Sequence, residues 1–137
     1  MKQTPYISKV DWHKQFKIRV RRNASNKHEV TKLEIVLKLI EKYKRQLFWI
    51  RIYTEYELTN TKDNVKICDV YFENIKTKEI ICYEIQNQVS KKWLDETKEF
   101  YDNFERIYFK TDWCLIKEKD IPEDLESIEN KIKELII

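Results

Sequence analysis

The sequence predicts a single α/β domain in which helices flank a central mixed β-sheet. The chain has 137 residues, a length that suits one domain with a substantial core. Short β-branched and aromatic runs alternate with longer segments of helical periodicity, in the order β-α-β-β-β-α-β-α. The sequence contains no internal repeat, low-complexity tract or linker. We therefore expect residues 1–137 to form one domain.

The first expected element is a basic strand over residues 13–22. Apolar side chains at Phe16, Ile18 and Val20 alternate with basic ones, which is typical of a strand with one cationic face. Residues 1–22 contain seven Lys or Arg against a single acid, although the net charge of the chain is only +3. A basic end on a near-neutral protein suits a polyanionic partner, with a plain solvated surface as the alternative. The residues expected to track a phosphate backbone are Lys17, Arg19, Arg21 and Arg22.

A helix is expected next, after a polar connector. Asn26, followed three residues later by Glu29, forms a candidate capping pair. Apolar residues then keep helical spacing to about residue 45, at Val30, Leu33, Leu37, Ile40 and Tyr43.

Three strands should follow this helix. Residues 48–56, 65–72 and 80–86 are rich in β-branched and aromatic side chains. The polar clusters 59–64 and 73–78 separate them as turns. The first two strands are therefore expected to form a hairpin that leads through the second turn into the third strand.

The last expected elements are a helix, a strand and a closing helix. Residues 91–101 are amphipathic and should cover one face of the sheet, and residues 112–117 read as a strand. The closing helix is expected over residues 122–136, with Pro122 in its first turn. Its expected apolar stripe consists of Leu125, Ile128, Ile132 and Leu135.

The composition excludes several classes of protein. The sequence has no glycine, which excludes a glycine-rich phosphate loop, a dinucleotide fingerprint and a nucleophile elbow. Cys68, Cys82 and Cys114 lack zinc-ligand spacing, so we expect free thiols, the first two in the core. No signal peptide or membrane-spanning run is visible. These features predict an intracellular protein in a reducing, cytoplasmic compartment, without a membrane partner.

Acidic residues inside two neighbouring strands are the strongest functional signal. Asp69 lies in the strand 65–72, and Glu84-Ile85-Gln86 lies fifteen positions later in the strand 80–86. Burying charged residues in strands is costly unless a partner compensates them, and a bound cation is the obvious candidate. Strand alternation places Glu84 and Gln86 on one face and Ile85 on the other.

This Asp…Glu-x-Gln pattern resembles the PD-(D/E)XK, or restriction-endonuclease-like, nuclease superfamily. The order helix, three strands, helix, strand over residues 28–117 is similar to the core of that superfamily. The resemblance implies a nuclease that hydrolyses phosphodiester bonds of nucleic acid, most readily DNA, with Mg²⁺ or Mn²⁺. It implies that Asp69 and Glu84 bind the metal and that the carbonyl of Ile85 adds a further oxygen.

Gln86 departs from the commonest family pattern, which has Lys at this position. Glutamine can position the attacking water by hydrogen bonding but carries no charge. In some members the lysine has moved to a neighbouring element. Lys91 or Lys92, at the start of the next helix, would then stabilise the phosphate, with Lys66 as a weaker candidate.

Members of the superfamily often place a further acid on the first core helix. Glu29, at the start of that helix, is the favoured additional metal ligand here. Glu34 on the same helix and Glu55 at the end of the preceding strand are the alternatives.

Two other functions fit the same sequence. A nuclease fold that has lost catalysis could serve as a DNA-binding or replication-associated module, which the missing lysine at position 86 favours. The helix 122–136 could instead pair with a partner in a protein-interaction role. Under the nuclease interpretation, one active site per chain would require a homodimer to cut both strands of a duplex.

Overall fold

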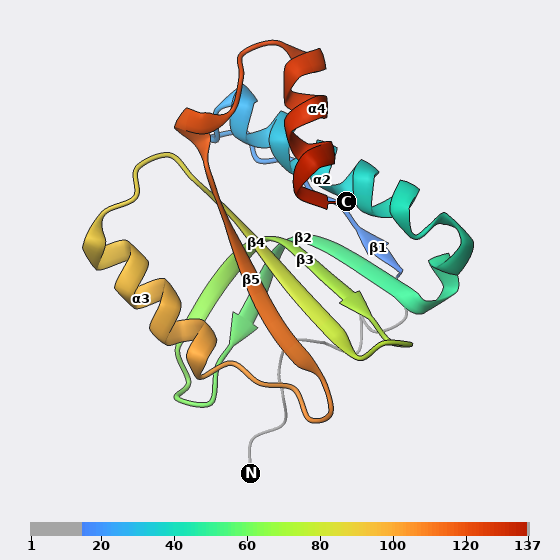
Figure 1. The fold of residues 1–137 in the computed structure, drawn as a ribbon. Coiled ribbons are helices and arrows are strands. Elements are labelled where there is room, and N and C mark those ends of the chain that lie inside the picture. Colours follow the sequence, from blue (N-terminus) through green and yellow to red (C-terminus); the bar gives the residue numbers. More distant parts are fainter. Residues whose placement is uncertain (1–14, 137) are drawn as a thin grey trace.

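The computed structural model describes residues 15–136 and shows a five-stranded mixed sheet with helices on both faces (Figure 1). The strands are β1 (Phe16–Lys17), β2 (Ile50–Thr59), β3 (Val65–Asn74), β4 (Glu79–Gln86) and β5 (Lys110–Lys117). The α-helices are α2 (Asn26–Lys42), α3 (Lys91–Asp102) and α4 (Leu125–Ile136). Two short 3-10 helices follow α2 and β5, namely η1 (Lys44–Trp49) and η2 (Glu118–Asp120). The predicted order β-α-β-β-β-α-β-α is confirmed.

The strands lie side by side in chain order, β1-β2-β3-β4-β5. β2, β3 and β4 form two antiparallel pairs, so the predicted hairpin is confirmed. β1 is parallel to β2, and β5 is parallel to β4. A parallel neighbour requires a crossover connection, and α3 supplies it between β4 and β5.

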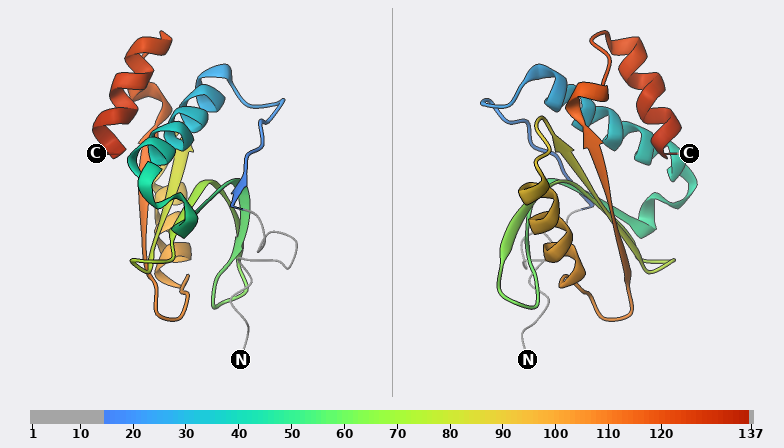
Figure 2. Two further views of the ribbon diagram at one scale, coloured as in Figure 1. Left: turned by 90° about the vertical axis from the view of Figure 1, so that its right-hand side faces the viewer. Right: turned by 60° about the vertical axis from the view of Figure 1, so that its left-hand side comes forward.

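The two faces of the sheet carry separate cores. α2 and α4 pack together on one face, over Ile52, Phe72 and Ile85 (Figure 2). α3 covers the other face, where aromatic residues and the buried thiols of Cys68 and Cys82 gather. The expectation that these two cysteines are in the core is confirmed. Among residues 15–136, no helix is long and apolar enough to cross a membrane.

The predicted basic strand 13–22 is wrong in extent. Residues 13 and 14 lie outside the described residues, and β1 comprises only Phe16 and Lys17, opposite Ile52 and Tyr53 of β2. The chain is then irregular: Arg19 still contacts β2, but through the hydroxyl of Thr54 and not through its backbone, and the segment then turns towards α2. Alternation predicts which side chains share a face, but a strand also needs a neighbour along its length.

The ends of two helices also differ from prediction. Ser25, not Asn26, caps α2, since its hydroxyl accepts a hydrogen bond from the backbone N–H of His28 at 3.0 Å. Pro122 lies before α4, which begins at Leu125. Asp124 accepts a hydrogen bond from the N–H of Ser127 there, at 2.9 Å. A side-chain oxygen supplied to the first turn therefore decides each start.

The apolar stripes of these helices are rotated from those predicted. In α4 the buried residues include Ile136 in place of Leu125 and Leu135, both of which are exposed. In α2, Leu37 is exposed, and charged residues occupy part of the buried face. The buried residues of α2 are His28, Glu29, Thr31, Lys32, Ile35, Val36 and Leu39.

Candidate active site

Asp69 and Glu84 lie where β3 and β4 separate. The antiparallel register between these strands ends at Val70 opposite Tyr83, one residue short of both acids. On the other side of β3, the register with β2 skips Asp69 and Glu55, which are not paired with each other. Glu55 has a φ of 50°, a left-handed conformation that costs a non-glycine residue on the order of 1 kcal/mol. Asp69 is therefore released from regular pairing on both of its sides.

The Asp69 carboxylate occupies the gap that the separating strands leave. Its Oδ2 accepts a hydrogen bond from the backbone N–H of Ile85 at 2.7 Å. Asp69 is buried, and this bond fixes its side chain against β4. The prediction that Asp69 and Glu84 lie on neighbouring strands is confirmed, and both line one cavity.

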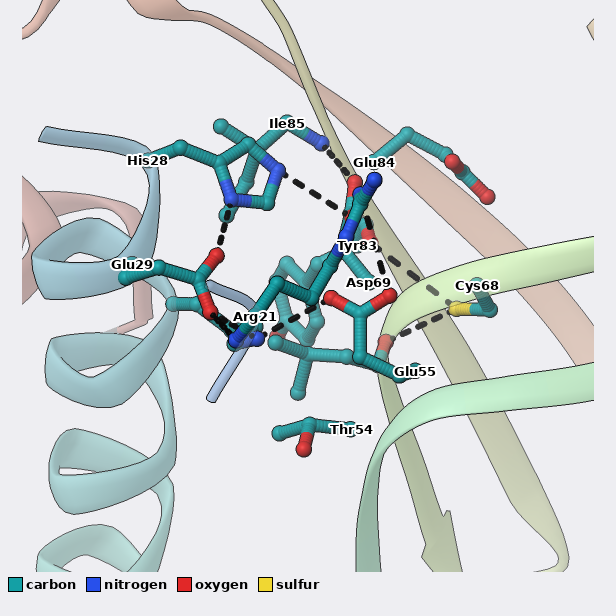
Figure 3. Close-up of polar contacts among 12 residues, drawn as sticks. Arg21, His28, Glu29, Thr54, Glu55, Cys68, Asp69, Tyr83, Glu84 and Ile85 are labelled. Atoms are coloured by element: carbon teal, nitrogen blue, oxygen red, sulfur yellow. Dashed lines mark hydrogen bonds and ion pairs between the residues drawn. The ribbon is translucent and has the colours of Figure 1, made fainter. Parts of the chain in front are cut away.

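An open cavity of about 350 Å³ lies in front of these acids. Polar and charged groups from α2, β3, β4 and the segment before α2 line it, and Figure 3 shows most of those that interact. The charged or strongly polar lining residues include Arg21, His28, Lys66, Asp69, Glu84 and Gln86.

Glu84 is almost fully buried on the face of the sheet that α3 covers. The hydroxyl of Tyr101 donates a hydrogen bond to its Oε2, and the Nζ of Lys66 lies 3.8 Å from its Oε1. Burial raises the pKa of Glu84 to about 7, against the attraction of Lys66. A carboxyl group with this pKa holds or releases a proton close to neutrality, and a cation bound beside it would favour the ionised form.

His28 joins α2 to Asp69, a contact to which sequence analysis assigned no role. Its Nδ1 lies 2.5 Å from Oε2 of Glu29, and its Nε2 lies 3.2 Å from Oδ1 of Asp69 (Figure 3). The hydrogen bond to Asp69 is the largest influence that raises the pKa of His28 to about 9, while burial opposes it. The imidazole is therefore charged at neutral pH and donates from both nitrogens. The only signal in the sequence is its place beside Glu29 at the helix start.

The raised pKa of His28 predicts a pH-dependent stability. A histidine whose folded pKa exceeds its unfolded value stabilises the fold fully below pH 6.5, and this contribution disappears as the pH rises through about 9. The difference corresponds to at most about 3 kcal/mol. We expect His28→Gln to destabilise the protein in urea unfolding at pH 6 and much less at pH 9.5. An equal loss at both pH values would contradict the charged imidazole.

Glu29 and Glu55 are held by a lysine that is fully buried. Lys32 has an Nζ 2.5 Å from Oε1 of Glu29 and 3.0 Å from Oε1 of Glu55. The N–H of Arg21 also donates to Oε1 of Glu29, at 2.5 Å. Burial alone would raise the pKa of Glu29, but these bonds and the His28 contact lower it. Both oxygens of Glu29 are thus engaged, and the ring of His28 joins it to Asp69.

Of the other acid and the three lysines that the sequence proposed for the site, only Lys66 lines the cavity. Glu34 does not line the cavity. Lys66 does, and it is held between Glu84 and the ring of Trp93. Lys91 and Lys92 are exposed on α3 and do not line it, and the Nζ of Lys92 lies 3.9 Å from Glu96 on the same helix.

Gln86 and Ile85 both line the cavity. The Nε2 of Gln86 donates a hydrogen bond to the carbonyl of Gln88 at 3.1 Å. Glu84 faces the α3 side, whereas Ile85 packs in the core on the α2 side. The predicted alternation between Glu84 and Ile85 is confirmed.

Of the predicted phosphate-contacting residues, Lys17 ends β1 and the three arginines lie along the segment that joins β1 to α2. Lys17 is half-buried, whereas Arg19, Arg21 and Arg22 are exposed. Arg21 also lines the cavity, with its guanidinium 3.9 Å from Oε2 of Glu55. The segment therefore brings positive charge to the edge of an acidic site.

The donor set suits a hydrated cation better than one enclosed by protein. Within residues 15–136, no three His, Cys, Asp or Glu side chains are grouped as a metal site. Mg²⁺ retains several waters and needs only one or two carboxylates. Asp69 and Glu84 offer such oxygens at an open polar cavity, so these residues fit Mg²⁺ or Mn²⁺.

Comparisons of this chain with known protein families, with curated proteins and with solved structures find no match. The functional argument therefore depends on the geometry and chemistry of the site itself.

Proposed function

We propose that this chain is a nuclease of the PD-(D/E)XK type, which hydrolyses phosphodiester bonds of nucleic acid, preferably DNA, with Mg²⁺ or Mn²⁺. The observation that carries the proposal is the separation of β3 and β4 at Asp69 and Glu84, which presents both acids to one open cavity. The order of elements from α2 to β5 supports it, because it is the order of the nuclease core.

The main charged and polar residues at the cavity have separate parts in this proposal. Asp69 and Glu84 would hold the metal, which when bound activates a water and neutralises charge at the phosphate. Gln86 would orient the attacking water. Of the candidate lysines, Lys66 has the best position to bind the phosphate, since it alone lines the cavity. His28 would orient Asp69 by donating to its Oδ1.

This geometry gives Glu29 a supporting part. Its carboxylate accepts from His28, Lys32 and the N–H of Arg21, so it would fix the imidazole and leave metal binding to the two acids on the strands. Metal ligands are usually oriented by such outer hydrogen bonds.

A catalytically inactive DNA-binding module is the second candidate, and a specific observation favours it. Position 86 carries no charge, and both strand acids already have protein partners in His28, Tyr101 and Lys66. The third possibility, a helix-mediated interaction protein, has less support. The apolar side of α4 packs internally through Ile128, Ile132 and Ile136.

Metal-dependent cleavage tests the proposal against the inactive module. Purified protein is expected to cut linear, single-stranded or branched DNA in Mn²⁺ and to stop in EDTA. Asp69→Asn, which keeps the size of the side chain, should remove this activity. Cleavage of RNA of the same sequence, measured in parallel, tests whether DNA is the preferred substrate. Binding without cleavage of any of these substrates would leave the inactive module.

Binding to DNA should depend strongly on salt because of the exposed arginines before α2. Each phosphate contact contributes a slope of about 0.9 to the dependence of log affinity on log salt for a duplex. Replacing Arg19, Arg21 and Arg22 by Ser should lower the slope by about 2 to 3 in fluorescence anisotropy titrations. A control of equal charge replaces exposed lysines elsewhere, namely Lys76, Lys98 and Lys133. Equal slopes for both variants would show that the arginines form only a solvated face.

A further inference from the structure

A second cavity lies directly beside the candidate active site. Its volume is about 340 Å³, and it shares Lys66 and Trp93 with the first cavity as a common wall. It is bounded further by the start of β3, where Val65 is exposed, and by Phe100 of α3. The two cavities therefore form adjoining compartments on either side of one lysine and one aromatic ring.

Trp93 is fixed at the border between the compartments. It lies in the first turn of α3, where its backbone N–H donates to the hydroxyl of the capping Ser90 at 3.0 Å. The Nζ of Lys66 lies 5.2 Å from the centre of the indole ring and 3.8 Å from Oε1 of Glu84. One lysine thus connects the ring to the acid that is proposed to hold the metal.

The charges that line the second cavity favour an uncharged base of a nucleotide over its phosphate. Glu96 and Glu99 line it, whereas the lysines that they contact, Lys92 at 3.9 Å and Lys62 at 3.6 Å, do not. A phosphate placed there would therefore meet carboxylates and be repelled. An uncharged base carries ring faces that stack on indole and donors that carboxylates accept. Lys66, which also lies 3.8 Å from Glu84, is the cationic residue that lines both cavities and can contact a phosphate at their border.

We propose that the second cavity binds the base of an unpaired nucleotide, stacked against Trp93, whose phosphate lies beside Lys66 in the active-site cavity. The proposal rests on the proposed nuclease function and restricts the class of nucleic acid that the nuclease would accept. A base that is paired within a duplex cannot enter a side cavity without leaving its stack. The substrate class is therefore single-stranded or locally unpaired nucleic acid.

Affinity measurements in EDTA test this without cleavage. Three fluorescently labelled probes of equal length are used, namely oligothymidylate, a duplex, and an abasic strand that keeps sugars and phosphates. Trp93→Ala should weaken oligothymidylate binding about tenfold or more, which is the usual effect of losing one base stack. Its binding to the duplex and the abasic strand should change less than twofold. The control is Trp49→Ala, a 40 % exposed tryptophan next to Ile75, at the opposite end of β3 from Lys66.

A second measurement covers the case in which Trp93→Ala does not fold. Oligothymidylate should quench the tryptophan fluorescence of the wild type and of Trp49→Phe, but much less that of Trp93→Phe. Equal quenching in both Phe variants would overturn the proposal, as would equal weakening of oligothymidylate and abasic-strand binding by Trp93→Ala. If wild-type protein cuts DNA in Mn²⁺ but Trp93→Ala leaves oligothymidylate binding unchanged, the base-site proposal is overturned and the nuclease proposal stands. If Trp93→Ala weakens oligothymidylate binding as expected but wild-type protein cuts no DNA, the nuclease proposal is overturned and the base-site proposal stands.

Discussion

Glu84→Ala is expected to abolish metal-dependent cleavage, with a loss of roughly 10³-fold or more. Loss of one group that stabilises the transition state typically costs 10²–10³-fold, and Glu84 is proposed both to hold the cation and to set its position. DNA binding in EDTA should stay the same or improve, because the substitution removes a carboxylate that repels phosphate. Mn²⁺ binding by calorimetric titration should weaken in parallel with activity.

The matched control for this substitution is Glu79→Ala. Glu79 lies at the start of the same strand, is exposed, and does not line the cavity. It should retain wild-type cleavage. A Glu84→Ala protein that cuts DNA as fast as Glu79→Ala would remove Glu84 from the catalytic site.

The pKa of Glu84 adds a second signature to the same experiment. A carboxyl group with a pKa of about 7 is protonated below that pH and is then a poor metal ligand. Cleavage by the wild type should therefore rise as the pH increases from 6 to 8. Since Mn²⁺ favours the ionised carboxylate, higher Mn²⁺ concentrations should move this rise to lower pH.

Sequence patterns predicted the sheet well because each strand carries its own local signal. The β-branched runs around Ile52, Val70 and Ile81, and the polar turns between them, required no knowledge of the rest of the fold. The alternation that separates Glu84 from Ile85 is likewise local, and it held. The basic strand failed because the backbone of Arg19 bonds the hydroxyl of Thr54 and not the β2 backbone, next to the left-handed Glu55, which no pattern within 13–22 records.

The charged contacts of the site were less accessible from sequence. Lys32 and His28 resemble ordinary surface residues of a charged helix, and only the packing of α2 against the separated strands buries them. The apolar stripe of α2 was misplaced for the same reason, since ionic groups fill part of its buried face. The left-handed conformation of Glu55 is equally hidden, because a glutamate within a β-type run gives no local signal for a positive φ.

Lys32→Met is expected to produce the largest loss of stability of any single substitution at the site. The side chain of Lys32 is fully buried between Glu29 and Glu55. Methionine fills a similar volume but removes the buried cation shared by Glu29, which is buried, and Glu55, which is half-buried. Breaking a buried ion pair typically costs about 3–5 kcal/mol. For a domain of this size, that corresponds to a fall in Tm on the order of 10–20 °C. Thermal unfolding followed by circular dichroism measures it.

Two further variants separate the charge effect from loss of packing. Lys38→Met changes a lysine on the same helix whose partners Glu41 and Glu129 are exposed, and it should alter Tm little. Adding Glu29→Gln and Glu55→Gln to Lys32→Met removes the uncompensated charges, so part of the lost stability should return. If the triple variant is less stable than Lys32→Met alone, the carboxylates are not left unpaired by the loss of the lysine. Lys32 would then stabilise the fold through its packing and not by compensating the charges of Glu29 and Glu55.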